Sequence, residues 1–364
     1  STRKESSAAS DVYKRQMLGG CVTMLTAKQN MIECMKGSKG NPDRYVNQYE
    51  AVKLLFHPFM FESPLLQEGM ENVKNAWGVT NSFPKGVPGA FPVHTPDKIV
   101  VKDIEHWRDY VKAPSLDFSQ EQWDQCKAMY DAVDGDKAFK AAFVAPGLFE
   151  QSHHLCELVN ALTYYIEYED EMHDLIKYLT EWELKLAEGI CSNLHPDMLF
   201  HHDDWGSYTS TFISVPMFED FFIEPYKEIY GYYKSHGVDY IVHHSDSYAA
   251  TLVPSMIEMG IDVFQGCMET NKVDELLPKY GDQISFMGCI ENIICDKEDW
   301  TDESVETYVR QVCDKYGYKS FIPCICQGGP GSVYKGVYGA ITNTIDKINK
   351  EKFGIEHPEE GRVP

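Results

Sequence analysis

Short apolar runs alternate with amphipathic stretches along this 364-residue chain after residue 138. Each run has the composition of a strand buried on both faces, and the stretch after it has helical periodicity. A repeated strand–helix order implies parallel strands joined by crossover helices. The six runs are residues 139–149, 198–200, 240–242, 261–264, 284–287 and 321–325.

Two weaker runs, at residues 46–56 and 76–80, would bring the number of strands to eight. We therefore expect an α/β protein in which residues 17–364 form a single (β/α)8 TIM-barrel domain with an irregular N-terminal helical extension. A doubly wound open sheet is the competing fold, but no Gly-x-Gly-x-x-Gly motif follows any of the runs.

The N-terminal part contains two distinct segments. Residues 1–16 are polar, basic against an acidic remainder and without an initiator Met, so we interpret them as a non-native or disordered leader. Thr26 is expected to cap an amphipathic helix over residues 27–35, which ends at Gly37.

Two of the apolar runs break abruptly into adjacent imidazoles and carboxylates, at residues 200–206 and 241–247. In a barrel, the carboxyl ends of the strands meet at one rim, where the active site lies. Ionisable groups gathered there would shift each other's pKa values and could act as acids, bases or metal ligands. A plainer interpretation is that one His of each pair is exposed and one Asp caps a helix.

The predicted strand ends supply the candidate site residues. We expect acid–base chemistry from His202, Asp203, Asp204 and His243. Four cysteines also fall at strand ends, and thiolates beside imidazoles are ligands that zinc prefers, although Cys is equally common as a small buried hydrophobe. The remaining strand-end and loop residues are expected to contact substrate: Phe149, Glu150, Trp205, Tyr208, Tyr248 and Gln265.

Composition narrows the possible partners and compartments. The formal net charge is -23, which disfavours binding to nucleic acid. The eleven cysteines are odd in number and no secretory leader precedes them, so reduced thiols in the cytoplasm are expected. No apolar run is long enough to span a membrane. None of the six arginines stands at a predicted strand end, which favours a neutral, small or aromatic substrate.

Several short motifs follow one another in a specific order between residues 26 and 345. They are residues 41–44 (Asn-Pro-Asp-Arg), 77–79 (Trp-Gly-Val), 103–107 (Asp-Ile-Glu-His-Trp), 145–150 (Ala-Pro-Gly-Leu-Phe-Glu), 203–206 (Asp-Asp-Trp-Gly) and 286–288 (Phe-Met-Gly). This order resembles the uroporphyrinogen decarboxylase superfamily, particularly its branch of cobalamin-dependent methyltransferases. The resemblance implies a (β/α)8 barrel with its site at the carboxyl ends of the strands.

The chain departs from both branches of that superfamily. The decarboxylases carry an Arg-Gln-Ala-Gly-Arg segment after the first strand, whereas residues 54–59 contain no arginine. The methyltransferases hold zinc with His-x-Cys after the fifth strand and with a Cys after the last strand. Here His243 keeps the first position, Ser245 replaces the Cys, and the cysteines near the last position are one residue out of place. The resemblance therefore implies a possible zinc site drawn from His243, Asp246, Cys324 and Cys326, with Cys267 or Cys289 as substitutes.

The resemblance implies a corrinoid-dependent methyltransferase component of the O-demethylase type. It would move a methyl group between a small methoxylated substrate, methylamine or thiol and cobalamin on a separate corrinoid protein. The histidines and aspartates would protonate or polarise the leaving atom, with a metal as Lewis acid if one is bound. One alternative is a decarboxylase that acts on an acid smaller than uroporphyrinogen. Another is a non-catalytic protein that binds a corrinoid or tetrapyrrole.

Overall fold

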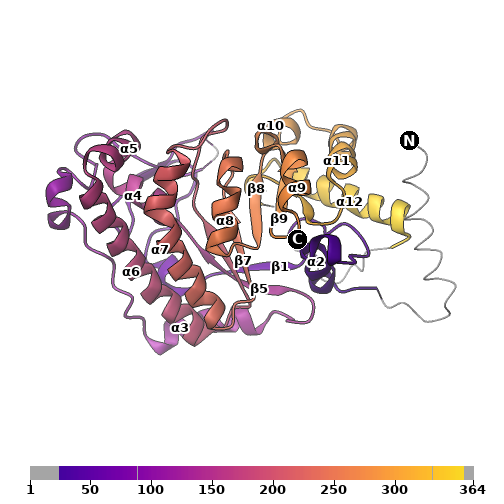
Figure 1. Cartoon of the computed structure of the whole chain (residues 1–364), viewed down its shortest axis with the longest axis horizontal. Helices are drawn as coiled ribbons and strands as arrows, with labels where there is room; N and C mark the ends of the chain where they lie inside the picture. The colour runs from indigo at the N-terminus through magenta and orange to yellow at the C-terminus, as the bar shows by residue number, and fades with distance from the viewer. Residues whose placement is uncertain (1–23, 88, 330, 356–364) are drawn as a thin grey trace.

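Parallel strands form the centre of the molecule. A computed structural model of the chain describes residues 24–87, 89–329 and 331–355, so the proposed leader at residues 1–16 lies outside the described part. Its main sheet has seven parallel strands in the order β1-β5-β6-β7-β8-β9-β10, so that each strand lies beside its predecessor (Figure 1). The strands are β1 (Val52–Leu55), β5 (Phe139–Val144), β6 (Met198–His202), β7 (Tyr240–His244), β8 (Val263–Cys267), β9 (Ser285–Ile290) and β10 (Phe321–Ile325).

The sheet curls so that its first and last strands approach each other. Gln48, just before β1, donates from its backbone N–H to the carbonyl of Pro323 (3.3 Å) and accepts from the N–H of Ile325 through its side chain (3.4 Å). These bonds connect the start of β1 to β10. The predicted α/β, TIM-barrel type of fold is thereby confirmed.

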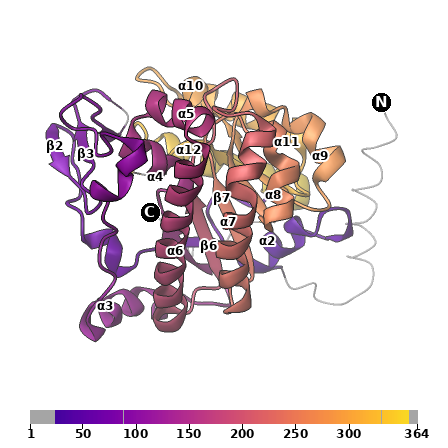
Figure 2. The ribbon, with the colours of Figure 1, turned by 60° about the vertical axis from the view of Figure 1, so that its left-hand side comes forward.

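The predicted number of eight strands is wrong for the described residues. The run at 76–80 forms a turn, and only Thr80 begins a strand, in a separate antiparallel sheet. This small sheet lies at the periphery of the molecule (Figure 2) and consists of β2 (Met70–Lys74), β3 (Thr80–Phe83) and β4 (Phe91–Pro92). Asn75 accounts for the turn, because its side chain accepts from the N–H groups of Trp77 and Val79.

Helices cover the outer face of the curled sheet, and the long α6 and α7 run side by side in both views (Figures 1 and 2). None of the helices in the described ranges is both long and apolar enough to cross a membrane. The helices are α2 (Ala27–Met35), α3 (Gln120–Asp131), α4 (Leu148–Cys156), α5 (Leu158–Glu167), α6 (Glu169–Leu194), α7 (Val215–Ser235), α8 (Val253–Met259), α9 (Val273–Tyr280), α10 (Asn292–Cys295), α11 (Asp302–Tyr316) and α12 (Val337–Phe353).

The N-terminal helix α2 agrees with its prediction in both position and cap. Thr26 accepts from the N–H of Gln29, whose side chain accepts from the N–H of Thr26, which is a complete capping box. The helix is tied to the strand side of the barrel by Lys28, which pairs with Asp197 just before β6. The extension therefore packs against the barrel as one unit.

Gly147 allows β5 and β6 to meet closely at the rim. Its N–H donates to the carbonyl of His202 at 2.7 Å. A Cβ at this position would lie 2.5 Å from the Cβ of Asp203 and 2.7 Å from Cε1 of His201. No side chain larger than hydrogen fits there without moving the end of β6.

We expect Gly147→Ala to lower the free energy of unfolding by about 1–3 kcal/mol, because the new methyl group overlaps buried atoms. Gly231→Ala is the matched control, since Gly231 lies inside α7 with no atom within 4 Å of the added Cβ. That change should be neutral or stabilise the protein by up to about 1 kcal/mol. Urea denaturation of both variants measures the difference, and equal stabilities would contradict the packing argument.

Candidate functional site

The pairing of β6 with β7 decides which histidines reach the inside of the barrel. In this parallel pair His201 lies opposite His243, and His202 lies opposite His244. Neighbouring residues in register point to the same face, and successive residues of a strand alternate. One histidine pair therefore faces the outer helices, and the other pair faces the interior.

In the outward pair, His201 and His243, every ring nitrogen has a partner in a buried series of hydrogen bonds. Nε2 of His201 lies 2.7 Å from a carboxylate oxygen of Glu183 on α6. The hydroxyl of Tyr230 on α7 lies 3.2 Å from Nδ1 of His201 and 3.1 Å from Nδ1 of His243. Nε2 of His243 lies 3.1 Å from the backbone carbonyl of Asp203.

The donor and acceptor of each hydrogen bond in this series follow from the group at its end, the backbone carbonyl of Asp203. Burial lowers the pKa of His243 well below its ordinary value, so the ring is neutral. Because a carbonyl only accepts, Nε2 of His243 carries the proton and Nδ1 accepts from Tyr230. Tyr230 then accepts from Nδ1 of His201, and Nε2 of His201 meets the carboxyl group of Glu183. No ring nitrogen of this pair remains free for a substrate or a metal.

Asp203 also belongs to this outward layer. Its carboxylate accepts from the N–H groups of Phe149 (3.1 Å) and Glu150 (2.8 Å) in the first turn of α4, and from the indole of Trp205 (2.8 Å). The hydroxyl of Tyr226 provides a fourth donor. Burial raises the pKa of Asp203, and the donors oppose that rise. The plainer interpretation of an Asp that caps a helix therefore fits Asp203.

Replacing Asp203 by Asn places an amide N–H2 among four donors, so at least one of them loses its acceptor. We expect Asp203→Asn to lower the free energy of unfolding by about 1–3 kcal/mol. Asp204→Asn should change it by less than about 1 kcal/mol, because the amide oxygen can still accept from the N–H of Asp246. Urea denaturation measures both changes in the free energy of unfolding. A larger loss of stability for Asp204→Asn than for Asp203→Asn would contradict the structural role assigned to Asp203.

The inward pair forms the centre of the candidate site. His202 and His244 stack with ring centroids 4.6 Å apart and an interplanar angle of 22°. Nε2 of His202 lies 3.7 Å from Asp204 Oδ2 and 3.1 Å from Glu150 Oε2. Asp246 Oδ2 lies 3.7 Å from Nε2 of His244. Two imidazoles and three carboxylates thus converge at the carboxyl ends of β6 and β7.

The charges of this cluster shift the pKa values of its members. Burial alone would lower the pKa of His202, but Glu150, Asp204 and Asp246 outweigh burial and raise it to about 10. Burial raises the pKa of Glu150 to about 7, against the opposing effect of His202. Burial and Asp246 raise the pKa of Asp204, whereas the neighbouring histidines lower that of Asp246. In the absence of another cation, His202 is the positive charge that balances these carboxylates.

The cluster lies at one end of a cavity of about 550 Å³, a volume typical of sites for small molecules. Phe143 and Phe200 cover its inner wall beside His202 and His244. Among the described residues that line the cavity, Lys53 is the only lysine or arginine, and it pairs in register with Lys140 of β5. The lining residues are Tyr49, Val52, Lys53, Leu54, Leu55, Val133, Phe143, Phe200, His202, His244, Asp246, Gly328, Gly329 and Tyr338.

The residues predicted to contact substrate are divided between the cavity side and the core. Glu150 and Gln265 meet the cluster through His202 and His244, respectively. Tyr208 is exposed and donates to Glu291 at 3.1 Å, and Tyr248 is half-buried in the neighbouring loop. Two residues lie instead in the aromatic core outside the strands, where Phe149 stacks on Tyr165 and Trp205 stacks on His243.

The metal-ligand set predicted from the sequence is not brought together among the described residues, where the groups of close potential ligands do not include it. His243 has no free nitrogen, as shown above. The thiol of Cys326 donates to the carbonyl of Cys267 at 3.1 Å, and burial raises the pKa values of Cys324 and Cys326. The zinc set implied by the resemblance therefore does not fit this chain.

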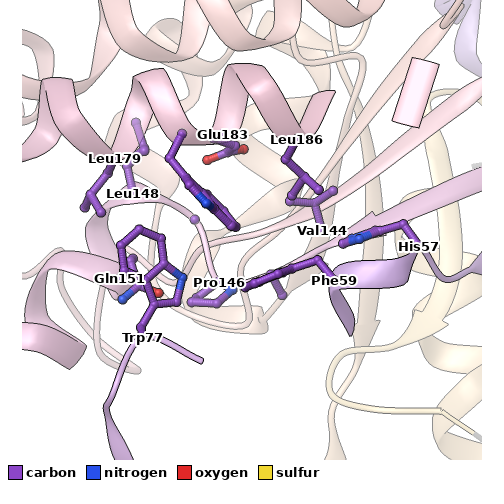
Figure 3. Close-up of a pocket in the computed structure, with 13 residues that line it drawn as sticks. His57, Phe59, Trp77, Val144, Pro146, Leu148, Gln151, Leu179, Glu183 and Leu186 are labelled. Carbon is purple, nitrogen blue, oxygen red and sulfur yellow. The ribbon is translucent and has the colours of Figure 1, made fainter. Parts of the chain in front are cut away.

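A second, much smaller cavity lies outside the wall formed by β5 (Figure 3). It measures about 20 Å³, room for one water molecule. Trp77, Phe59 and Glu183 surround it, and both ring nitrogens of the buried His57 lack hydrogen-bond partners in the structure. This space is too small for a substrate. A hollow of about 560 Å³ between α6 and α7 is lined by residues of those two helices, such as Glu181 and Tyr232, and by none of the cluster. The cavity that holds the cluster is therefore the candidate binding site.

Burial lowers the pKa of His57 to about 4, so protonation of this residue favours the unfolded chain between pH 6.5 and 4. Stability from His57 is present above pH 6.5 and is lost as the pH falls. We expect His57→Leu to reduce the stability loss between pH 7 and pH 5 by roughly 2 kcal/mol. Urea denaturation of both proteins at the two pH values measures this difference. An unchanged pH dependence in His57→Leu would contradict a lowered pKa for His57.

Three residues that organise the site were not predicted from the sequence: Glu183, Tyr230 and His244. Glu183 gave a usable signal, because it falls on the apolar face of α6 in step with Leu179 and Leu186. A carboxylate at such a position needs a buried partner. Tyr230 is less distinctive because many aromatic residues line the same face of α7.

Comparison with known proteins agrees with this fold. The model of the uroporphyrinogen decarboxylase (URO-D) family matches residues 65–323. This chain belongs to the uroporphyrinogen decarboxylase family. A search of curated proteins gave no match.

One solved structure shares this fold. A methyltransferase from Methanosarcina mazei superposes with a TM-score of 0.60 at 11% sequence identity, covering 89% of this chain and 99% of that chain. At this identity the likeness bears on the fold alone. A sugar phosphate isomerase/epimerase from Parabacteroides distasonis ATCC 8503 gives a TM-score of 0.22 at 12% identity, covering 66% of this chain and 70% of the other.

Proposed function

We propose that this protein is a methyltransferase component that moves a methyl group between a small substrate and cobalamin on a separate corrinoid protein. The observation that carries the proposal is the convergence of His202, Asp204, His244 and Glu150 at the end of an apolar cavity. Family membership and the fold shared with the M. mazei methyltransferase support it. Bound cobalamin supplies a strongly nucleophilic cobalt that accepts the methyl group.

The cavity favours a neutral substrate such as a methyl ether, a neutral methylated amine or a thiol in the reverse direction. Its inner wall is aromatic and aliphatic, and its polar groups gather at the rim. A volume of about 550 Å³ holds such a molecule but not a corrinoid, so we place the corrinoid on the partner protein. The partner would approach at the rim, where the cavity meets the ends of the strands.

The chain's own residues would hold the substrate and supply a proton. The apolar wall orients the molecule with its methyl group toward the rim and keeps water away from it. Glu150 Oε2 is buried and pairs with Nε2 of His202 at 3.1 Å, and burial raises the pKa of Glu150 to about 7, so this carboxyl group can protonate the leaving oxygen or nitrogen. His202, Asp204 and His244 polarise the same atom.

The decarboxylase alternative has less support from the described residues. Each arginine there is engaged elsewhere: Arg44 with Asp43, Arg108 with Asp174, and Arg310 with Glu306 and Glu351. None of them lines the cavity, so a polycarboxylate would lack bidentate partners. A non-catalytic carrier would not need acid and base groups within 3.1 Å of each other, as Glu150 and His202 are.

Methyl transfer can be followed by the cobalamin spectrum on mixing the protein with a cob(I)alamin carrier and a panel of methyl ethers, methylamines and thiols. We expect methylation of the cobalt, or its reversal, with at least one class. Silence across the panel, beside a methyltransferase that works in the same assay, would contradict the proposal.

With an active substrate in hand, we expect Glu150→Gln to lower the rate at least ~10²-fold, because it removes the proton donor and leaves the cavity unchanged. Glu224→Gln is the control, since that side chain is 80% exposed on α7. The Glu150→Gln variant should show the same fold reduction in rate for all members of one substrate class. Rates equal to those of the control would return Glu150 to a structural role.

A further inference from the structure

The site holds a group of side chains that suits a metal ion, and it differs from the sulfur-containing set that the resemblance implies. Donor atoms of His202, Asp204 and His244 all lie within 4.8 Å of one another. We propose that these three residues bind one divalent transition-metal ion through nitrogen and oxygen alone, without a thiolate. The ion's catalytic role rests on the proposed function, but its binding can be measured independently.

The donor atoms of the proposed ligands lie near one another without forming normal hydrogen bonds. Nε2 of His202 lies 3.7 Å from Asp204 Oδ2, longer than a normal hydrogen bond, and the donor atoms of all three residues lie within 4.8 Å of one another. Atoms that each lie 2.0–2.2 Å from one ion are separated by roughly 3–3.5 Å. Side-chain shifts of up to roughly 1–2 Å would therefore bring these groups into coordination.

One of the imidazoles is already oriented for coordination. The side-chain oxygen of Gln265 accepts from Nδ1 of His244, so this nitrogen carries the proton. The lone pair of Nε2 is then directed toward the cluster. Metal-binding histidines commonly have their second nitrogen fixed by such a bond, which sets the tautomer. Gln265 is fully buried, and its amide nitrogen has no partner of its own.

The charge of the cluster also favours a cation. Glu150, Asp204 and Asp246 lie together, and their ion pairs in the described part of the chain are with histidines only. Glu150 Oε2 has its ion-pair contact with Nε2 of His202, 3.1 Å away. Half-buried carboxylates grouped in this way repel one another unless a positive charge compensates them. A divalent ion would supply that charge and allow both imidazoles to be neutral ligands.

The ligand types narrow the choice of metal. Two imidazoles with one carboxylate suit Zn²⁺, Co²⁺, Fe²⁺ or Mn²⁺, whereas a site without sulfur does not favour Cu⁺. Three protein ligands leave a position open toward the cavity, as in catalytic sites. His244 faces inward whereas His243 does not, so His244 is the imidazole available at this position, and the carboxylate of Asp204 would take the place of a thiolate.

The test uses the full-length protein, stripped with a chelator and titrated with Co²⁺ alone while its optical spectrum is recorded. We expect one equivalent to bind, with visible ligand-field bands and without an intense sulfur-to-cobalt charge-transfer band. Asp204→Asn and His244→Ala should weaken binding at least ~100-fold, and Gln265→Ala about 10-fold. Circular dichroism verifies the fold, and the conservative Asp204→Asn variant carries the test if His244→Ala fails to fold.

Two control variants locate the ion. His173→Ala alters the other, exposed group of potential ligands, formed by Glu169, His173 and Asp220, and should leave the affinity unchanged. Cys326→Ser should likewise leave the affinity for Co²⁺ unchanged. A sulfur charge-transfer band, affinity that survives Asp204→Asn, or no binding below millimolar Co²⁺ would each overturn the inference. Methyl transfer by metal-free protein would overturn the ion's catalytic role and leave the proposed function intact. Protein that binds Co²⁺ at this site but transfers no methyl group would support the metal site and contradict the proposed function.

Discussion

The parallel pairing of β6 with β7 is the constraint on which the site depends. Each strand ends in two adjacent histidines, and the register places His201 beside His243 and His202 beside His244. Since successive side chains point to opposite faces, one register produces two pairs with different surroundings. The outer pair meets helices α6 and α7, and the inner pair meets the cavity. A slip of one residue in either strand would place one histidine of the outer pair opposite one histidine of the inner pair, and the two pairs would be lost.

The outer layer holds this register in place. Glu183 and Tyr230 come from the long helices α6 and α7, and they bond both outward histidines. Asp203 joins the end of β6 to the start of α4, and Gly147 lets the two approach. These bonds leave few polar groups of the outer layer unsatisfied, which suits a structural role. Available donors and acceptors remain in the inner layer, at Glu150, His202 and His244.

Much of the fold was predictable because its signals are local. The cap at Thr26, helix α2 and the later strands follow from apolar periodicity and capping residues within a few positions. The run at 139–149 was predicted too long, since β5 ends at Val144 and Phe149 lies in α4. Both elements are apolar, so composition alone does not mark the boundary between them.

The sequence predicted which segments contain the candidate site, but not which of their residues form it. The sequence pointed to residues 200–206 and 241–247, and these do meet at one rim. It did not distinguish His243 from His244, because the alternation of a strand has two phases and doubled histidines fit both. Glu183 and Tyr230, which lie 18 residues from His201 and 13 from His243, decide the phase through tertiary contacts. The resemblance led us to expect thiolate ligands, whereas the group of potential ligands at this rim offers imidazole nitrogen and carboxylate oxygen.

The central claim is that His243 is bound into the wall whereas His244 faces the cavity, and the tautomers of the two rings report on it directly. Long-range ¹H–¹⁵N correlation spectra of histidine-labelled, metal-free protein, assigned with single His→Gln variants, distinguish the two forms. The account predicts the Nε2–H form for His243, bonded to the carbonyl of Asp203, and a proton on Nδ1 of His244, bonded to Gln265. The reverse assignment would place His243 in the cavity and contradict the account.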